Sequence, residues 1–258
     1  MQEFDLDIIV PVYNEPDNIL KLMESLDGHV RSRYRLLICY DREEDTTLSV
    51  FPRLHEPRHP VVLVRNSGTG VLGAVVTGFN RSTAPVVVTM PADDHYNAPR
   101  IDAMAARVRD GADIVCASRF VGDGCMLGCP PVKAALVRVT AWFMYYVAGV
   151  PTHDPTSGFR FFSRRVVEQI PIETKAGFAY SMELLVKCHR LGWRIEERPA
   201  LWYERVVGTS RFRVFKWAPV YLAWVRYAMA TRFLGRGPET VVLRNGALGR
   251  SDRREDGK

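Results

Sequence analysis

Adjacent carboxylates are the most chemically distinctive feature of this sequence of 258 residues. Asp93 and Asp94, with His95 beside them, follow a short apolar run that ends at Met90. Oxygen ligands at the end of a strand suit Mg²⁺ or Mn²⁺, which keep several coordination positions open for the phosphates of a substrate. We therefore expect a divalent cation that bridges a diphosphate here, and the alternative is an ordinary solvated turn.

Arginines form the second chemical pattern. They occur in three separated segments, Ala117-Ser-Arg119, Asp154-Pro-Thr-Ser-Gly-Phe-Arg160 and Arg205-Val-Val-Gly-Thr-Ser-Arg211. A guanidinium group is planar and carries paired N–H donors, so it matches the oxygens of a phosphate. The pattern predicts a phosphate-bearing substrate in addition to a nucleotide, and the alternative for each arginine is a surface ion pair.

A third feature lies at the end of the first apolar run, in the segment Val10-Pro-Val-Tyr-Asn-Glu-Pro16. Its Glu15 can accept hydrogen bonds from a ribose or a base, or it can cap the following helix. Other nucleotide-binding motifs are missing or misplaced. The sequence contains no P-loop, and Gly68-Thr-Gly-Val-Leu-Gly73 follows the third strand rather than the first. A dinucleotide-binding enzyme is therefore not favoured.

Alternating strands and helices must position these groups. Apolar runs predict strands at 7–12, 35–40, 60–65, 85–90 and 112–118, and helical spacing predicts helices at 16–26, 70–80 and 99–109. This alternation is typical of an α/β fold with a mostly parallel sheet covered on both faces. Ligands bind at the carboxyl ends of such strands. We therefore expect one crevice to collect the polar residues that follow the strands, namely Asn14, Glu15, Asp41, Asn66, Asp93, Asp94 and Arg119.

The composition is that of a soluble globular protein, with 47% apolar and 25% charged residues, and it excludes a disordered chain. Five cysteines are too few for a disulfide scaffold and indicate a reducing compartment. The acidic start of the chain does not resemble a signal peptide. The net charge of +6 arises from residues 201–258, which contain 12 Lys and Arg against 5 Asp and Glu. Such a segment suits nucleic acid, an anionic membrane surface or a phosphorylated substrate.

Two expected helices of the second half are candidates for membrane contact. Residues 132–150 and 212–234 contain uncharged stretches of 14 and 9 residues, too short for a bilayer span of roughly 20. Aromatic side chains beside Lys and Arg suit the headgroup layer. The alternative is that both helices pack on the sheet. A further strand is expected at 194–203.

Taken together, the motifs resemble those of the inverting glycosyltransferases of the dolichol-phosphate mannose synthase type, also called polyprenyl-phosphate glycosyltransferases. The shared motifs are Pro11-Val-Tyr-Asn-Glu15, Gly70-Val-Leu-Gly-Ala-Val-Val-Thr-Gly-Phe79, the Asp93 loop, Ala117-Ser-Arg-Phe120, Asp154 to Arg160, and Arg205 to Phe212. The resemblance covers residues 7–213 and implies a GT-A fold. It also implies a GDP- or UDP-sugar donor, Mg or Mn, and transfer with inversion to a lipid phosphate at the cytoplasmic membrane face.

On the donor side, the resemblance implies that the nucleotide-sugar is bound by Pro11, Tyr13, Glu15, Asp41, Gly70 and Asp93. The family motif Asp-Asp-Gly-Ser-x-Asp is replaced by Tyr40-Asp-Arg-Glu-Glu-Asp45, so base recognition is expected to differ. The family metal loop Asp-Ala-Asp-x-Gln is replaced by Pro91-Ala-Asp-Asp-His95. Asp93 is therefore the expected metal ligand, with Asp94 and His95 as substitutes for the missing groups.

On the acceptor side, the resemblance implies a phosphate site formed by Arg119, Lys133, Arg138, Arg205, Ser210 and Arg211. Catalysis is then expected to depend on Asp93, Arg119 and Arg205. Asp154 is expected either to orient an arginine or a sugar hydroxyl, or to cap a helix. Glu183 is expected to be structural.

The resulting prediction divides the chain into a catalytic domain (1–211), an amphipathic membrane-interface helix (212–236) and a disordered tail (237–258). The expected partners are a nucleotide-sugar, a polyprenyl phosphate and a membrane surface, without nucleic acid, and the expected location is cytoplasmic and peripheral to the membrane. Two rival functions are a soluble glycosyltransferase that acts on a small metabolite and a degenerate, non-catalytic binding subunit. The sequence does not specify the sugar, the base of the donor or the lipid.

Overall fold

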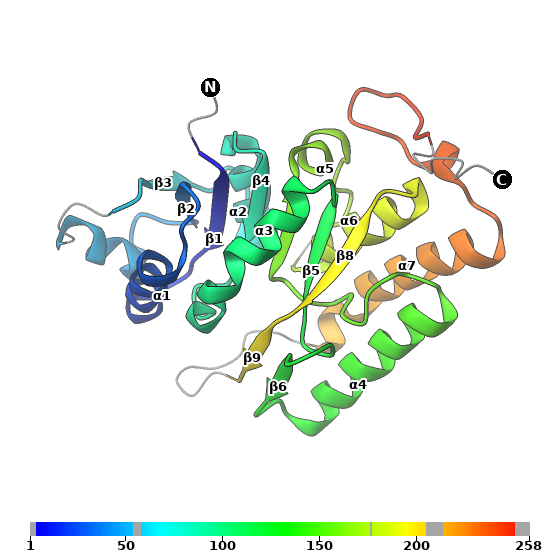
Figure 1. Ribbon diagram of the computed structural model, residues 1–258, viewed down its shortest axis with the longest axis horizontal. Helices are drawn as coiled ribbons and strands as arrows, with labels where there is room; N and C mark the ends of the chain where they lie inside the picture. The colour runs from blue at the N-terminus through cyan, green and yellow to red at the C-terminus, as the bar shows by residue number, and fades with distance from the viewer. Residues whose placement is uncertain (1–3, 54–57, 176, 205–213, 251–258) are drawn as a thin grey trace.

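A seven-stranded sheet forms the centre of the molecule in the computed structural model, which describes residues 4–53, 58–175, 177–204 and 214–250 (Figure 1). The strands lie in the order β3-β2-β1-β4-β7-β5-β8. Their bounds are β1 (Leu6–Pro11), β2 (Tyr34–Tyr40), β3 (Val61–Arg65), β4 (Val86–Thr89), β5 (Ile114–Ser118), β7 (Arg160–Ser163) and β8 (Ile195–Pro199). All neighbours are parallel except for β7, which runs antiparallel to β4 and β5. The predicted α/β class and mostly parallel sheet are confirmed.

Helices cover both faces of this sheet. On one face, α1 (Pro16–His29) and α3 (Ile101–Arg109) share a hydrophobic cluster with the strands. On the other face, α2 (Gly70–Arg81) and α6 (Ala179–Leu191) share a second cluster. Successive strand side chains point to opposite faces, so Ile8 joins the first cluster and Ile9 the second. The shorter helices are η1 (Thr46–Arg53), η2 (His95–Arg100), α5 (Arg164–Gln169) and η4 (Pro238–Thr240).

The strand predicted at 194–203 is divided at Ala200 into two strands that belong to different sheets. The Ala200 N–H donates to the Ser118 carbonyl (2.7 Å), which continues the pairing of β8 with β5, and the Ala200 carbonyl accepts the Cys125 N–H (3.1 Å). Beyond this point β9 (Leu201–Tyr203) pairs with β6 (Cys125–Leu127) in a small parallel sheet. The chain therefore leaves the central sheet just where a crevice is expected.

The two helices that were expected to contact a membrane differ in the residues that they bury. In α7 (Val214–Phe233), Trp224 and Ala228 are buried against α6. The Lys187 ammonium lies 5.5 Å from the Trp224 ring, and the Arg190 guanidinium lies 3.3 Å from the Tyr227 ring. Two of the aromatic residues expected to meet lipid headgroups, Trp224 and Tyr227, thus pack against α6, whereas Phe233 near the end of α7 is 59% exposed.

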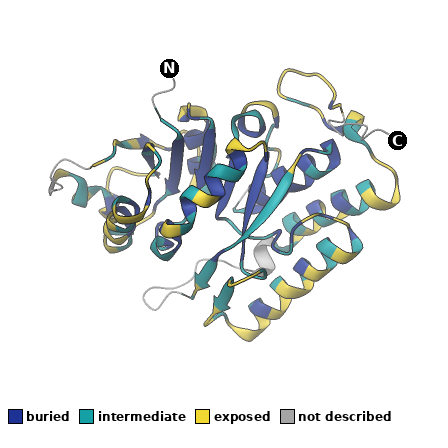
Figure 2. Cartoon of the chain, in the orientation of Figure 1, coloured by how far each residue is buried: buried dark blue, intermediate teal, exposed yellow. Residues whose placement is uncertain are grey.

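The other long helix, α4 (Pro131–Trp142), continues into one π-helical turn, η3 (Phe143–Val147). Its outer side exposes an apolar stripe that consists of Val132, Leu136, Val139, Trp142 and Tyr146 (Figure 2). Their spacings of three and four residues place them on one side of the helix. We call these five residues the α4 stripe.

The described part of the C-terminal segment, up to residue 250, has defined secondary structure and contacts. Of the tail expected to be disordered at 237–258, residues 237–250 form η4 and an isolated bridge between Val242 and Leu248, and Arg244 N donates to the Gln169 carbonyl (2.8 Å). Residues 251–258 lie outside the described residues. Among the helices that the structure describes, none combines the length and the apolar character needed to cross a membrane.

Candidate active site

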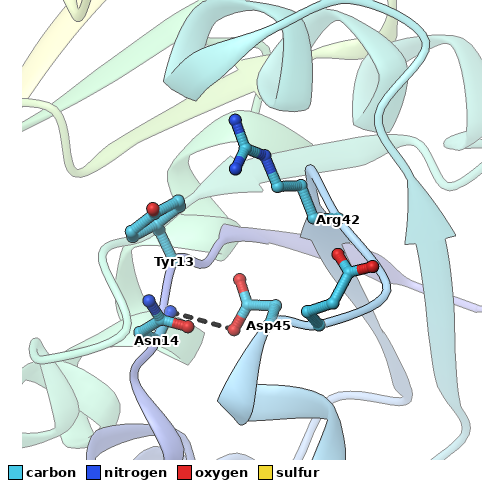
Figure 3. A pocket seen from close by; sticks show the side chains of 5 residues that line it. Tyr13, Asn14, Arg42 and Asp45 are labelled. Atoms are coloured by element: carbon cyan, nitrogen blue, oxygen red, sulfur yellow. Dashed lines mark hydrogen bonds between the residues drawn. The ribbon is translucent and has the colours of Figure 1, made fainter.

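The loops after β1 and β2 enclose a hollow at the carboxyl edge of the sheet. Asn14 follows β1 with a positive φ of 56°, which asparagine adopts more readily than most residues. Its backbone N–H donates to Asp45 Oδ1 (2.9 Å), and its side-chain oxygen accepts the Thr46 N–H (3.1 Å). These bonds join the two loops around a volume of about 470 Å³ lined by Tyr13, Asn14, Arg42, Glu44 and Asp45 (Figure 3).

Of the expected donor residues, Tyr13 lines this hollow, and Pro11 and Glu15 lie two residues before and after Tyr13 in the chain. Pro11 is the last residue of β1 and pairs in register with Cys39 of β2. The Tyr13 side chain is 42% exposed. Glu15 occupies the N-cap position of α1, but its side chain accepts a hydrogen bond from Asn18 Nδ2 (2.6 Å) and does not cap the helix backbone.

Asp41 and Gly70, also expected on the donor side, meet at the start of α2. The carboxylate of Asp41 accepts hydrogen bonds from Asn66 Nδ2 (2.5 Å) and from the Gly70 N–H (2.8 Å). Gly70 has a φ of +67°, where a side chain would introduce strain. A carboxylate is also favourable at a helix N-terminus. Asp41 therefore fixes the turn from β3 into α2 and is already bonded within the protein.

The three predicted metal ligands do not converge. Asp94 is buried, and its Oδ1 accepts a hydrogen bond from Asn97 Nδ2 (2.5 Å). The His95 carbonyl accepts a hydrogen bond from Ser25 Oγ of α1 (2.8 Å), and among the described residues its buried Nδ1 has no partner. Burial raises the pKa of Asp94 well above its usual value, and the nearby charge of Asp93 adds to this effect. Within the described ranges, no three His, Cys, Asp or Glu side chains are grouped to hold a metal ion.

The arrangement nevertheless suits a cation that takes most of its ligands from a substrate. Mg²⁺ is commonly held by one or two carboxylates together with substrate phosphates, and it retains several waters. Asp93 is partly exposed at the end of β4, whereas Asp94 is buried and bonded to Asn97. The residues therefore fit a site in which Asp93 is the principal protein ligand.

Arg119, at the end of β5, is held in a buried ion pair with Asp154. Its Nε and Nη2 atoms donate to the two carboxylate oxygens at 2.6 and 2.7 Å, and its backbone N–H donates to Oδ2 at 3.0 Å. Nη2 also donates to Thr156 Oγ1 (2.8 Å). Of the two alternatives for Asp154, the structure therefore favours the one in which it orients an arginine.

Electrostatics reinforce this pair. Burial alone would raise the pKa of Asp154, but the Arg119 guanidinium and its hydrogen bonds hold the pKa below its usual value. The Arg119 charge also acts on Asp94 and opposes the rise in the pKa of that carboxyl group. Asp94 in the loop after β4 and Arg119 after β5 are therefore close enough for their charges to interact, which agrees with the expectation that both loops face one crevice.

Arg160 corrects the expectation that it binds a phosphate or forms a surface ion pair. It is fully buried at the start of β7, and its guanidinium donates to the carbonyls of Ser181 (2.5 Å) and Asp154 (3.1 Å). The reason is topological, because β7 inserts between β4 and β5 and carries Arg160 into the interior. Arg160 thus fixes the backbone of Asp154, and the side chain of Asp154 in turn binds Arg119. The sequence motif places Arg160 in a loop, whereas it is the first residue of β7.

The remaining acceptor residues are only partly described. Lys133 pairs with Glu204 (3.2 Å) and lies 4.8 Å from the Trp202 ring, whereas Arg138 is exposed on α4. Arg205, Ser210 and Arg211 lie outside the described residues. Glu183 is structural as expected, because its carboxylate pairs with Lys187 (2.7 Å) and accepts the Glu173 N–H (2.6 Å).

Comparison with known proteins relates this geometry to an activity. Residues 7–171 match the model of Glycosyl transferase family 2. The chain is 28% identical to the polyprenol monophosphomannose synthase of Mycolicibacterium smegmatis over 211 residues, and this aligned region covers 79% of each chain. It is 26% identical over 233 residues to the undecaprenyl-phosphate mannosyltransferase of Micrococcus luteus, covering 88% of this chain and 95% of the relative. Among solved structures, the fold is similar to that of glucosyl-3-phosphoglycerate synthase from Mycobacterium tuberculosis, with a TM-score of 0.60 and 17% sequence identity. The alignment covers 92% of this chain and 82% of that chain, and that structure contains Mn²⁺, UDP-glucose and phosphoglyceric acid.

Proposed function

The chain belongs to glycosyl transferase family 2, and on this premise we propose that it transfers a sugar from a nucleotide-sugar to a polyprenyl phosphate. The family match confirms the glycosyltransferase resemblance indicated by the motifs, and the sheet with its structural neighbour confirms the GT-A fold. The relatives named for polyprenol and undecaprenyl phosphate support the lipid acceptor, and they support mannose as the sugar.

One observation carries the proposal for the acceptor site. Arg119 uses Nε and Nη2 to bind Asp154, whereas its Nη1 lies 3.9 Å from Met126 Sδ, which is a weak acceptor. Nη1 therefore retains the capacity to donate to a phosphate oxygen. Asp154 fixes the plane of the guanidinium, so little conformational entropy is lost when the phosphate binds. Arg205, Ser210 and Arg211 are proposed to complete this phosphate site, with Lys133 or Arg138 from α4.

The proposed reaction needs no strong general base. A phosphate monoester is anionic at neutral pH, and one of its oxygens attacks the anomeric carbon of the sugar. The new carbon–oxygen bond forms while the bond from that carbon to the nucleoside diphosphate breaks, and the diphosphate leaves with the electron pair. In-line attack inverts the anomeric carbon. The protein then has to position two anionic groups and to stabilise the charge on the leaving diphosphate.

On the donor side, we propose that Pro11, Tyr13 and Glu15 bind the nucleoside, with Asp41 and Gly70 shaping the adjacent turn. Asp93 is proposed to hold Mg²⁺ or Mn²⁺, which when bound neutralises charge on the diphosphate. The structural neighbour solved with Mn²⁺ and UDP-glucose supports a divalent cation in this fold. Asp94, bonded to Asn97, is proposed to support the loop rather than to replace Asp93 as a ligand.

We also propose that the α4 stripe rests on a membrane surface at the cytoplasmic face. Its five side chains are between 44% and 66% exposed, and they include an aromatic pair, Trp142 and Tyr146, with ring centroids 5.9 Å apart. Arg138 is exposed on the same helix, and the Arg232 side chain passes beside Gly149, just after η3. Apolar and aromatic side chains flanked by cations suit an anionic headgroup layer. We propose this surface, rather than α7, as the principal contact with lipid, because Trp224 and Tyr227 of α7 pack against α6.

A transfer assay tests the proposal. The purified protein is incubated with Mg²⁺ or Mn²⁺, a polyprenyl phosphate in detergent, and radiolabelled GDP-mannose, UDP-glucose or another nucleotide-sugar. We expect label to enter the organic phase with at least one donor. Nucleotide binding without transfer from any donor to any acceptor would contradict the proposal and favour a non-catalytic binding subunit.

A further inference from the structure

A largely buried carboxylate of β8, Glu197, contacts the loop that carries Asp154. Glu197 pairs in register with Cys116 of β5, three residues before Arg119. Its side chain is 13% exposed, and it meets His153 in the loop between η3 and β7. Glu197 is thus placed beside the segment that leads to the ion pair of the proposed phosphate site.

The Glu197 carboxylate binds the two residues that precede Asp154. Its Oε1 accepts hydrogen bonds from the His153 N–H (2.8 Å) and from the Thr152 hydroxyl (3.2 Å). Its Oε2 lies 2.9 Å from His153 Nδ1, which donates to it when that nitrogen carries a proton. One carboxylate therefore fixes two consecutive residues of the loop.

The Thr152 hydroxyl extends this contact to Asp154. It donates to Glu197 Oε1 and accepts the Asp154 N–H (3.1 Å). Thr152 and Asp154 are both completely buried, where a polar group that loses its partner is costly. Because the Asp154 carboxylate binds Arg119 through both oxygens, a continuous chain of contacts runs from Glu197 to the guanidinium of Arg119.

The His153 ring gives the loop a second support. It stacks on the Tyr145 ring of η3, with centroids 3.8 Å apart and planes inclined by 26°. Tyr145 meets the ring of Tyr146, a member of the α4 stripe, edge to face at 4.9 Å. The loop before Asp154 is therefore held between β8 and the end of the helix that carries the α4 stripe.

The adjacent Glu196 shows how a carboxylate of the same strand serves the fold alone. Its side chain is 15% exposed, nearly as buried as that of Glu197. It accepts hydrogen bonds from Arg107 Nε and from Arg194 Nη2, each at 2.6 Å. Successive strand side chains point to opposite faces of a sheet, so Glu196 faces away from the loop that Glu197 binds. Glu196 is therefore a matched control.

We propose that Glu197 is a positioning residue for the acceptor phosphate, because it sets Asp154 and thereby the Arg119 guanidinium. Without this carboxylate, the Thr152 hydroxyl and the His153 N–H lose their acceptor. The loop can then shift, and Arg119 Nη1 no longer meets a phosphate oxygen at the best angle. This inference rests on the proposed function, because it takes Arg119 to bind the phosphate of the lipid.

Steady-state kinetics of sugar transfer by the full chain test the inference. The KM for polyprenyl phosphate is measured at saturating nucleotide-sugar, and the KM for the nucleotide-sugar at saturating lipid, below the melting temperature of each variant. Glu197→Ala should raise the lipid KM about tenfold and leave the nucleotide-sugar KM unchanged, since a small displacement of a binding group is enough for such an effect. Glu197→Gln keeps an oxygen in the place of Oε1, so it should restore most of the lipid affinity.

Two further variants separate positioning from stability. Glu196→Ala removes the counter-ion of Arg107 and Arg194, so it should lower the melting temperature and leave both KM values unchanged. Thr152→Val keeps the size of the side chain but removes the hydroxyl between Glu197 and Asp154. It should raise the lipid KM as Glu197→Ala does, and it decides the question if Glu197→Ala does not fold.

The outcomes distinguish this inference from the proposed function. A selective rise in the lipid KM in Glu197→Ala that Glu197→Gln reverses supports the inference. A lipid KM that stays at the wild-type value in Glu197→Ala and Thr152→Val, or that rises equally in Glu196→Ala, overturns it, while transfer by the wild type still supports the proposed function. If the wild type transfers no sugar to the lipid, the proposed function fails and this inference fails with it.

Discussion

Asp154 holds Arg119 through two parallel hydrogen bonds, from Nε to Oδ2 at 2.6 Å and from Nη2 to Oδ1 at 2.7 Å. The Asp154 side chain is completely buried, and the Arg119 side chain is 11% exposed. A two-point pair of this kind fixes the plane of the guanidinium as well as its position. The orientation of the proposed phosphate-binding arginine is therefore set by a residue 35 positions away in the sequence.

Asp154→Asn should destabilise the protein and slow sugar transfer. The amide keeps the shape of the carboxylate but lacks its charge, which leaves the Arg119 guanidinium buried without a counter-ion. Breaking a buried pair in this way costs about 3 kcal/mol of unfolding free energy. Urea unfolding measures the loss. Asp123→Asn is a matched control, because Asp123 pairs with Arg100 but its side chain is 67% exposed, so its loss should be small.

The same pair predicts a dependence of stability on acid. The pKa of Asp154 is lower in the folded protein than its usual value of 3.8, so its ionised form favours folding. This contribution is fully present above pH 3.8 and is lost as the pH falls through the folded pKa. The difference in unfolding free energy between the wild type and Asp154→Asn should therefore shrink when the pH is lowered from 7 to 3. A constant difference would show that the charge of Asp154 does not contribute.

Asp93→Ala should abolish metal-dependent transfer and leave the fold intact, because Asp93 is partly exposed in a loop. Asp94→Ala should instead lower the melting temperature, since it removes a buried group that is bonded to Asn97 (2.5 Å). Turnover measured across a range of Mn²⁺ concentrations, together with thermal melts, distinguishes the two effects. Turnover like that of the wild type in Asp93→Ala at low metal would remove Asp93 from the site.

The α4 stripe should carry the contact with lipid. Trp142→Glu and Val139→Glu each place a charge in an apolar layer, and each should reduce binding to anionic vesicles about tenfold, which corresponds to about 1.4 kcal/mol. Leu222→Glu on α7 is a matched control, because Leu222 and Trp142 are both 57% exposed. Co-sedimentation at low and high salt measures the effect. An equal loss with Leu222→Glu would return the contact to α7, and a wild type that never sediments would remove the membrane proposal.

The regular part of the fold could be predicted from the sequence. Runs of consecutive apolar residues form β1, β2, β4 and β5, and the groups that follow them were expected at one edge of the sheet. The insertion of β7 could not be predicted, because Arg160-Phe-Phe-Ser163 contains only two apolar residues and begins with a charged one. That insertion is what turns Arg160 from an expected ligand of phosphate into a buried support of Asp154.

The packing of Trp224 and Tyr227 of α7 against α6 is a second feature that the sequence does not predict. Trp224 and Tyr227 beside Arg226 are equally compatible with a lipid surface and with a protein partner, because periodicity does not reveal what a helix contacts. Lys187 and Arg190 of α6 provide the partners that draw these aromatic rings inward. In the metal loop, similarly, the sequence places Asp93 and Asp94 side by side, but only the structure shows that Asn97 is bonded to Asp94.

The most direct test of the central claim is a competition between two acceptors in one reaction. A polyprenyl phosphate and 3-phosphoglycerate are supplied together at equal concentration, with the labelled nucleotide-sugar that supports transfer. Partition between organic and aqueous phases then measures the two products. The account predicts that most of the label enters the organic phase as a polyprenyl-phosphate sugar. Label that remains in the aqueous phase on 3-phosphoglycerate would contradict it and identify the protein as a glycosyltransferase of soluble acceptors.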